Sequence, residues 1–90
     1  MDKRVKIKVF GKVQGVSYRY GVEKLAGEMD LKGWVANMPD GTVEIEAEGE
    51  EEGLNKLVDW CKQGSEYAEV ENVEVERGEA SGEFDSFERR

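Results

Sequence analysis

The stretch Val5-Lys-Ile-Lys-Val-Phe-Gly-Lys-Val-Gln-Gly-Val-Ser-Tyr-Arg19 decides the fold, because it joins a strand to a helix through one glycine-rich turn. Apolar residues alternate with lysines in its first half, which predicts a half-buried strand that ends near Gly11. Apolar residues then recur at helical spacing from about Tyr18 to Met29, which predicts an amphipathic helix. The chain therefore begins as strand, turn and helix.

The turn in the middle of this stretch has the composition of an anion-binding site. Gly11 and Gly15 allow successive backbone N–H groups to converge without a Cβ in the way. The start of the helix adds N–H groups that lack intrahelical partners, and Arg19 adds a charged fork. These features together predict that the turn binds phosphate.

A β-hairpin follows the first helix. Residues 33–37 and 42–48 read as its two strands, and Met38-Pro-Asp-Gly41 reads as the turn between them. The glutamates of the second strand are expected to point to water: Glu44, Glu46 and Glu48. The acidic run that continues to Glu52 is then a solvated face rather than a metal site, because it contains no His and no ligand spacing.

The second half of the chain contains another helix and another strand. Apolar residues at helical spacing define the helix, which Gly64 can end: Leu54, Leu57, Val58 and Cys61. Val73 and Val75 alternate with glutamates as a strand, and a short last segment lies around residues 84–88. Three aromatic residues are expected to supply area to the core or its edge: Trp34, Trp60 and Tyr67. The pair Arg89-Arg90 is expected to be a solvated tail.

This order of elements predicts an α+β fold, a ferredoxin-like two-layer sandwich. Its βαββαβ order gives an antiparallel sheet with two helices on one face, and a short extra strand follows at the C-terminus. The 90 residues are enough for one hydrophobic core and not for two, so residues 1–90 are expected to form a single domain.

The charge of the chain narrows the choice of partners. It carries 13 Lys and Arg against 21 Asp and Glu, a formal net charge of -8, which makes nucleic acid and anionic membranes poor partners. The first ten residues lack the apolar run of a secretory signal, and the single Cys61 cannot form an internal disulfide. We therefore expect a cytoplasmic protein, and the density of charge favours a monomer.

Two long motifs resemble the signatures of one enzyme family. Gly11-Lys-Val-Gln-Gly-Val-Ser-Tyr-Arg19 resembles the phosphate loop of the acylphosphatases, and Gly33-Trp-Val-Ala-Asn-Met-Pro-Asp-Gly-Thr-Val-Glu44 resembles their second signature. The resemblance covers nearly the whole chain. It implies a ferredoxin-like enzyme that hydrolyses acyl phosphates to a carboxylate and inorganic phosphate by in-line attack of water, with no metal and no cofactor.

The resemblance also implies the roles of individual residues. Arg19 would bind the phosphoryl group and Asn37 would hold the attacking water. The backbone amides that would surround the phosphoryl oxygens belong to Gln14, Gly15, Val16, Ser17, Tyr18 and Arg19. The chemistry is consistent with these roles, because Arg and amides stabilise charge on the equatorial oxygens while Asn orients water. Tyr18 departs from the pattern, since Phe is commoner at that position of the family.

Other interpretations of these residues compete with the catalytic one. Asp40 could be a general base, but in Pro39-Asp40-Gly41 it fits a turn residue better. Cys61 lies on the apolar side of a helix, where no neighbour in sequence would lower the pKa of its thiol. The domain as a whole could also be a non-catalytic module that binds phosphate or another anion, or that docks on a larger enzyme.

Overall fold

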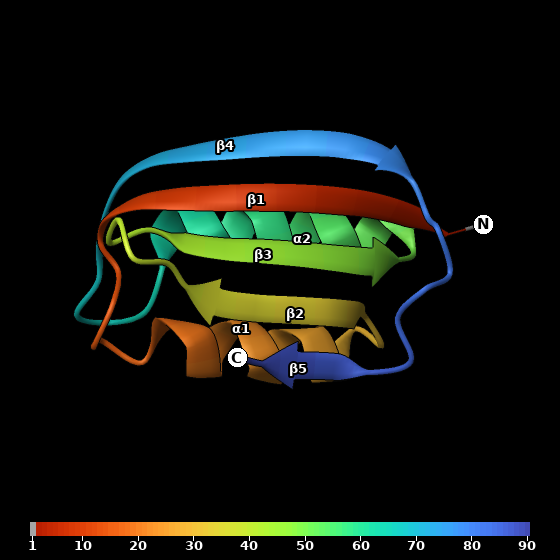
Figure 1. Cartoon of the computed structure of the whole chain (residues 1–90), viewed down its shortest axis with the longest axis horizontal. Coiled ribbons are helices and arrows are strands. Elements are labelled where there is room, and N and C mark those ends of the chain that lie inside the picture. The colour runs from red at the N-terminus through yellow and green to blue at the C-terminus, as the bar shows by residue number, and fades with distance from the viewer. Residues whose placement is uncertain (1) are drawn as a thin grey trace.

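The protein is a five-stranded sheet with the strand order β4-β1-β3-β2-β5 and two helices on one of its faces (Figure 1). The structure is a computed structural model and describes residues 2–90. Its elements in chain order are β1 (Lys3–Lys12), α1 (Tyr18–Glu28), β2 (Lys32–Asn37), β3 (Val43–Gly49), α2 (Glu51–Gln63), β4 (Glu69–Glu79) and β5 (Phe87–Arg89). The predicted ferredoxin-like sandwich is therefore confirmed.

Strand β1 lies inside the sheet between β4 and β3 and runs antiparallel to both. Strands β2 and β3 form the predicted antiparallel hairpin, with Val35 opposite Ile45. The short strand β5 pairs with β2 in parallel, with Val35 opposite Arg89. The pair of β5 with β2 is thus the one parallel pair in the described part of the sheet. It places residues 87–89 beside the hairpin of β2 and β3.

Strand β1 ends at Lys12, near Gly11 as predicted, whereas β4 is longer than the sequence pattern indicated. Strand β1 continues through Gly11 to Lys12, with a register shift between Phe10 and Gly11 where it pairs with β4. Strand β4 begins at Glu69, four positions before the alternating valines that predicted it. The alternation fails there because a bulge moves the side chains of one strand relative to the other.

The core lies between the helices and the sheet and is built from the apolar positions that alternate along the strands and recur along the helices. The buried apolar residues are Val5, Ile7, Val9, Val13, Tyr18, Val22, Ala26, Leu31, Val35, Val43, Ile45, Ala47, Leu54, Leu57, Val58 and Cys61. Gly21 lets α1 approach α2 closely, since a Cβ there would collide with the ring of Trp60. Trp60 packs against the core as predicted, whereas Tyr67 is 73% exposed and the prediction for it was wrong.

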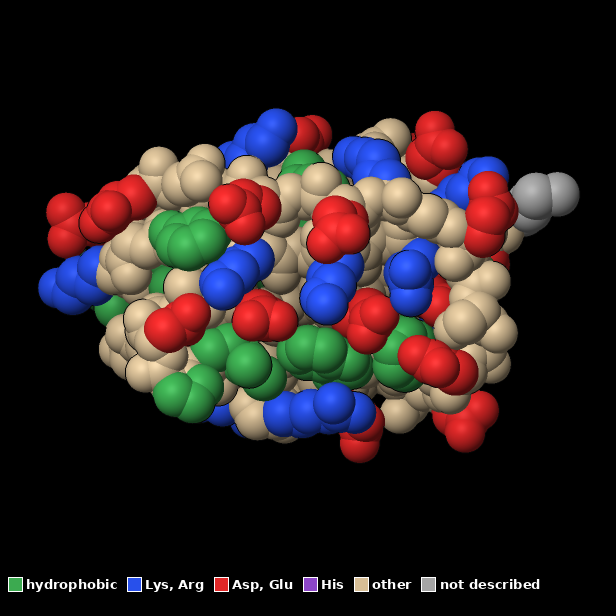
Figure 2. All heavy atoms as spheres, turned by 45° about the horizontal axis from the view of Figure 1, so that its top comes forward, with side chains coloured by type: hydrophobic (Ala, Val, Ile, Leu, Met, Phe, Trp, Pro, Cys, Tyr) green, Lys and Arg blue, Asp and Glu red, His purple; other side chains and the backbone are tan. Residues whose placement is uncertain are grey.

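The open face of the sheet carries charge in alternating columns. Lys6 of β1 lies between Glu46 of β3 and Glu76 of β4, and Lys8 lies in the same way between Glu44 and Glu74. Figure 2 shows blue and red side chains interspersed on this side of the molecule. Opposite charges across neighbouring strands stabilise the pairing, and each of these lysines offsets part of the charge of the two glutamates beside it.

Glu48 is the exception to the solvated acidic face. Its side chain was expected to point to water, but the residue is 5% exposed and its carboxylate accepts hydrogen bonds from Ser81 N at 2.8 Å, Ser81 Oγ at 2.8 Å and Gly82 N at 3.0 Å. Burial raises the pKa of this carboxyl, and the hydrogen bonds from Ser81 and Gly82 outweigh that effect and lower it. Glu48 thus fixes the segment that leads from β4 to β5.

We expect Glu48→Gln to lower the free energy of unfolding by about 2 kcal/mol at pH 7, because charge-assisted hydrogen bonds to a buried group are lost. The pKa of Glu48 is lowered on folding, so its contribution is present at neutral pH and is lost as the pH falls through the folded pKa. Urea unfolding at pH 7 and pH 3 measures both effects. The exposed Glu71 supplies the control Glu71→Gln, and equal stability of the two variants at pH 7 would contradict this role of Glu48.

Candidate active site

Three loops gather at one end of the sheet, where β1 ends and α1 begins (Figure 1). They are the loop of residues 13–17, which we call the cradle loop, the turn of residues 38–42 between β2 and β3, and the loop of residues 64–68 between α2 and β4. All the residues that the sequence analysis assigned to the site lie on these loops, on the first turn of α1 or at the end of β2.

The start of α1 leaves its first N–H groups without intrahelical partners. The first hydrogen bond runs from Gly21 N to Ser17 O at 3.1 Å, Ser17 adopts a left-handed conformation with φ 63°, and it makes no side-chain cap. The first turn of α1 contains no acidic residue, whereas the first turn of α2 contains Glu51 and Glu52. The positive end of the α1 dipole is therefore left available for an anion.

The two glycines of the motif have different structural roles. Gly15 has φ 73°, is exposed, and a Cβ there would meet no other atom within 4 Å. Gly11 has φ 126° and lies at the bulge, where a Cβ would collide with the carbonyl of Glu69 on β4. Gly15 therefore shapes the open part of the cradle loop, and Gly11 serves the pairing of β1 with β4.

The side chain of Gln14 connects the cradle loop to the turn at residues 38–42. Its Nε2 donates hydrogen bonds to Met38 O at 2.8 Å and to Thr42 O at 2.9 Å. The motif predicted a role only for the backbone amide of Gln14, because the partners of its side chain are main-chain carbonyls more than twenty positions away. The bridge holds the cradle loop next to Asn37, which directly precedes Met38.

Asp40 is a turn residue, as expected. Its Oδ1 accepts hydrogen bonds from Thr42 N at 3.0 Å and Thr42 Oγ1 at 2.6 Å, and Lys8 Nζ lies 3.4 Å from Oδ2. The hydrogen bonds from Thr42, with a smaller effect of Lys8, lower the pKa of the Asp40 carboxyl. A carboxylate held in its charged form by these contacts is a weak base, which favours the structural role.

The other side of the cradle loop is fixed by the helix layer. Ser65 Oγ donates a hydrogen bond to Val16 O at 2.6 Å, and the buried hydroxyl of Tyr18 donates to Cys61 O at 2.8 Å. The Tyr18 ring lies 5.0 Å from that of Trp60, centroid to centroid. Burial raises the pKa of the Cys61 thiol to about 12, so this cysteine is a core residue and not a nucleophile.

Arg19 is half-buried and its guanidinium is held by Arg90. Nη1 donates a hydrogen bond to the main-chain oxygen of Arg90 at 2.6 Å, and Arg90 N donates to Val35 O at 2.8 Å. Arg89 belongs to β5 and its Nε lies 3.7 Å from a carboxylate oxygen of Glu23. Arg89 and Arg90 are exposed, as expected, but they do not form a free tail, because both residues contact β2 or α1.

Asn37 is the last residue of β2, and its side-chain oxygen is buried. Among residues 2–90, Oδ1 of Asn37 has no hydrogen-bond partner, which singles it out among the buried side-chain atoms of this part of the chain. A buried acceptor without a partner costs about 1–3 kcal/mol, so native proteins usually satisfy it with water or a ligand. Asn37 can therefore accept a hydrogen bond from a molecule bound at this end of the sheet.

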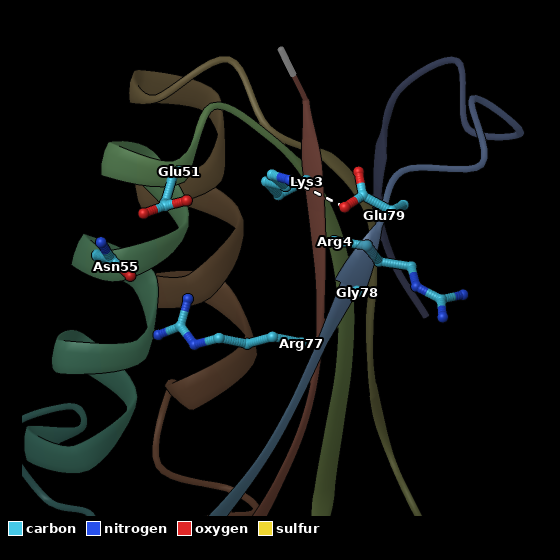
Figure 3. A pocket seen from close by; sticks show the side chains of 7 residues that line it. All are labelled: Lys3, Arg4, Glu51, Asn55, Arg77, Gly78 and Glu79. Atoms are coloured by element: carbon cyan, nitrogen blue, oxygen red, sulfur yellow. Dashed lines mark hydrogen bonds and ion pairs between the residues drawn. The ribbon is translucent and has the colours of Figure 1, made fainter.

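A hollow of about 380 Å³ lies at the opposite end of the sheet, where β1 starts and β4 ends (Figure 3). Its lining includes the ion pair of Lys3 with Glu79, at 2.9 Å, and the side chain of Arg77 points toward α2. Glu51 stands at the start of α2 beside it. Because acidic and basic groups are paired or mixed here, the hollow offers no concentration of positive charge to an anion.

An open helix N-terminus, an arginine and a buried amide oxygen at one end of a ferredoxin-like sandwich define a class of small phosphate-handling domains. A model of the acylphosphatase family matches residues 5–89, and the chain belongs to this family.

The individual relatives cover almost the whole chain. The chain is 47% identical to the acylphosphatase of Geotalea uraniireducens (strain Rf4), over 97% of this chain and 96% of the relative. It is 50% identical to the acylphosphatase of Acaryochloris marina (strain MBIC 11017), over 93% and 89%. The crystal structure of acylphosphatase from Bacillus subtilis superposes with a TM-score of 0.93 at 38% identity, and the match covers 98% of both chains.

We expect Gln14→Ala to weaken inhibition by inorganic phosphate about three- to tenfold, because the cradle loop loses its two bonds to the hairpin turn and its amides are less well placed. The inhibition constant of phosphate, measured against acyl phosphate hydrolysis, tests this. Gln63→Ala at the end of α2 is the control, since Gln63 is exposed. An unchanged inhibition constant in Gln14→Ala would mean that the loop keeps its shape without the bridge.

Proposed function

We propose that the protein hydrolyses the carboxyl–phosphate bond of acyl phosphates. The observation that carries this proposal is the buried Oδ1 of Asn37, which has no partner among residues 2–90 and lies at the end of the sheet where α1 starts. A module that only binds an anion needs N–H donors and a cation, not an additional acceptor. The family membership of the chain also favours an enzyme over a binding module.

The proposed reaction begins with the phosphoryl group at the start of α1. The amides of residues 14–19 and the guanidinium of Arg19 stabilise the charge on its equatorial oxygens. For this, the guanidinium of Arg19 leaves the main-chain oxygen of Arg90 for the phosphate, or donates to both at once. A guanidinium can donate two parallel hydrogen bonds to a phosphate, which a lysine ammonium cannot do. The half-buried position of Arg19 strengthens such a contact.

In the proposed reaction, Asn37 orients the attacking water. Its Oδ1 accepts a hydrogen bond from water, whose oxygen forms a bond to phosphorus while the bond from phosphorus to the acyl oxygen breaks. The proton of the water passes to a phosphoryl oxygen, so that a carboxylate and dihydrogen phosphate leave. A carboxylate is a stable leaving group that needs no general acid, which is consistent with a sequence that contains no histidine. The proposed reaction uses no metal and no cofactor.

We also propose that residues 1–90 act as one domain and as a cytoplasmic monomer. Within residues 2–90, neither helix has the length and apolar character needed to span a membrane. The edge strand β4 carries five glutamates, and these would oppose the pairing of two such edges. Sedimentation at several protein concentrations tests the monomer.

We expect Arg19→Ala to lower kcat for benzoyl phosphate about 100- to 1000-fold, because one electrostatic donor to the transition state is removed. Arg19→Lys should restore little, since an ammonium cannot form the two-pronged contact. The fall in ultraviolet absorbance of benzoyl phosphate, followed in buffer with a metal chelator, measures the rate. Arg77→Ala on β4 is the control; a wild-type rate for a folded Arg19→Ala variant would refute the role of Arg19.

Asn37→Ala should lower kcat about 100-fold while the inhibition constant of inorganic phosphate changes less than threefold, because the side chain acts on water and not on the phosphoryl group. Asn55→Ala on the exposed side of α2 is the matched control. Binding of phosphate by a folded wild-type protein that turns over no acyl phosphate would instead support a binding module.

A further inference from the structure

The peptide group between Val16 and Ser17, within the cradle loop, is bound by the protein on one side only. Ser65 Oγ donates a hydrogen bond to Val16 O at 2.6 Å. The hydrogen bonds within residues 2–90 include none that the N–H of Ser17 donates to a main-chain or side-chain acceptor. The protein therefore satisfies the carbonyl of this peptide group and leaves its N–H to water or a ligand.

The direction of this carbonyl fixes the direction of the N–H group. Residues 2–90 contain no cis peptide bond, and in a trans peptide the C=O of one residue and the N–H of the next point in opposite directions. Ser65 holds the carbonyl of Val16 toward the loop of residues 64–68, which comes from the helix layer (Figure 1). The N–H of Ser17 is therefore directed away from that loop.

The backbone of the cradle loop alternates in hand around this peptide group. Gly15 has φ 73° and Ser17 has φ 63°, whereas Val16 between them is not left-handed. Alternation of this kind turns successive N–H groups toward one point and forms a nest for an anion. The left-handed backbone of Ser17 is unfavourable for a residue with a Cβ, so it persists only where the surroundings impose it. The bond from Ser65 to Val16 is a constraint directly beside it.

The hydroxyl of Ser65 projects from a loop whose main chain is held in place. Gly64 N donates to Trp60 O at 2.6 Å, at the end of α2. Ala68 N donates to Ser65 O at 3.0 Å, which closes the turn that follows. Gly64 also lies close to the ring of Tyr18, since a Cβ there would be 3.3 Å from a ring carbon. The position of the Ser65 hydroxyl is therefore set by α2 and its loop, and not by the cradle loop that it binds.

We propose that Ser65 is a positioning residue, whose hydroxyl acts through the carbonyl of Val16 to direct the N–H of Ser17 at the phosphoryl group. Ser65 itself does not touch the substrate. This inference rests on the proposed function, in which the amides of residues 14–19 stabilise charge on the phosphoryl oxygens. Without the hydroxyl, the peptide group between Val16 and Ser17 can rotate, and its N–H then stabilises the transition state less well.

The test follows the amide proton of Ser17 by NMR as inorganic phosphate is added. In the wild type this proton should move downfield as it donates to the anion. In Ser65→Ala the shift at saturating phosphate should fall about twofold or more, and kcat for benzoyl phosphate about tenfold, because the donor is displaced rather than removed. Ser65→Thr keeps a hydroxyl and should restore most of both. Ser86→Ala is the control, since Ser86 is exposed and precedes β5, beside the start of β2 and not its end.

The outcomes separate this inference from the proposed function. A wild-type shift of Ser17 in Ser65→Ala, or a loss that Ser65→Thr does not restore, would refute the role of Ser65 and leave the proposed function intact. A loss of the same size in Ser86→Ala would show that removal of any surface hydroxyl has this effect, which also overturns the inference. A folded wild-type protein that hydrolyses no acyl phosphate, and in which phosphate shifts none of the amides of residues 14–19, would refute both.

Discussion

The unpaired N–H groups at the start of α1 are the feature on which the rest of the structure depends. A helix end without a side-chain cap and without an acidic first turn is unfavourable unless a ligand or water satisfies it. Its loop therefore has to be held from outside, and three contacts do this: Gln14 with the hairpin turn, Ser65 with Val16, and the Tyr18 hydroxyl with Cys61. The geometry of the proposed anion site thus depends on three neighbouring loops rather than on one motif.

Alternation and helical spacing were enough to predict the sandwich, because they report on which side of each element is buried. These patterns gave a wrong prediction where the main chain is irregular or where a charged side chain is buried. The bulge at Gly11 hid the first residues of β4, and the donors of Ser81 and Gly82 that bury Glu48 are more than thirty positions away. Local pattern carries no information on such partners.

In the candidate site, too, some features could be predicted from the sequence and others could not. The side chains that contact substrate in the proposed reaction were found by motif, because Arg19 and Asn37 belong to two long signatures. The contacts that position Arg19 and the cradle loop could not be found in this way, since no motif marks the main-chain oxygen of Arg90 or the hydroxyl of Ser65. Sequence alone also could not separate Gly15 from Gly11, which differ in what lies above each Cα.

The hydrogen bond from Arg19 to the main-chain oxygen of Arg90 spans 71 positions of the chain. Loops of this length close slowly, and proteins rich in such contacts fold more slowly than those with local ones. The guanidinium is therefore held only in molecules in which β5 has already docked beside β2. An ensemble that has collapsed around β1, β3 and the two helices would contain the cradle loop without this contact, so Arg19 gains its fixed position only when the last strand docks.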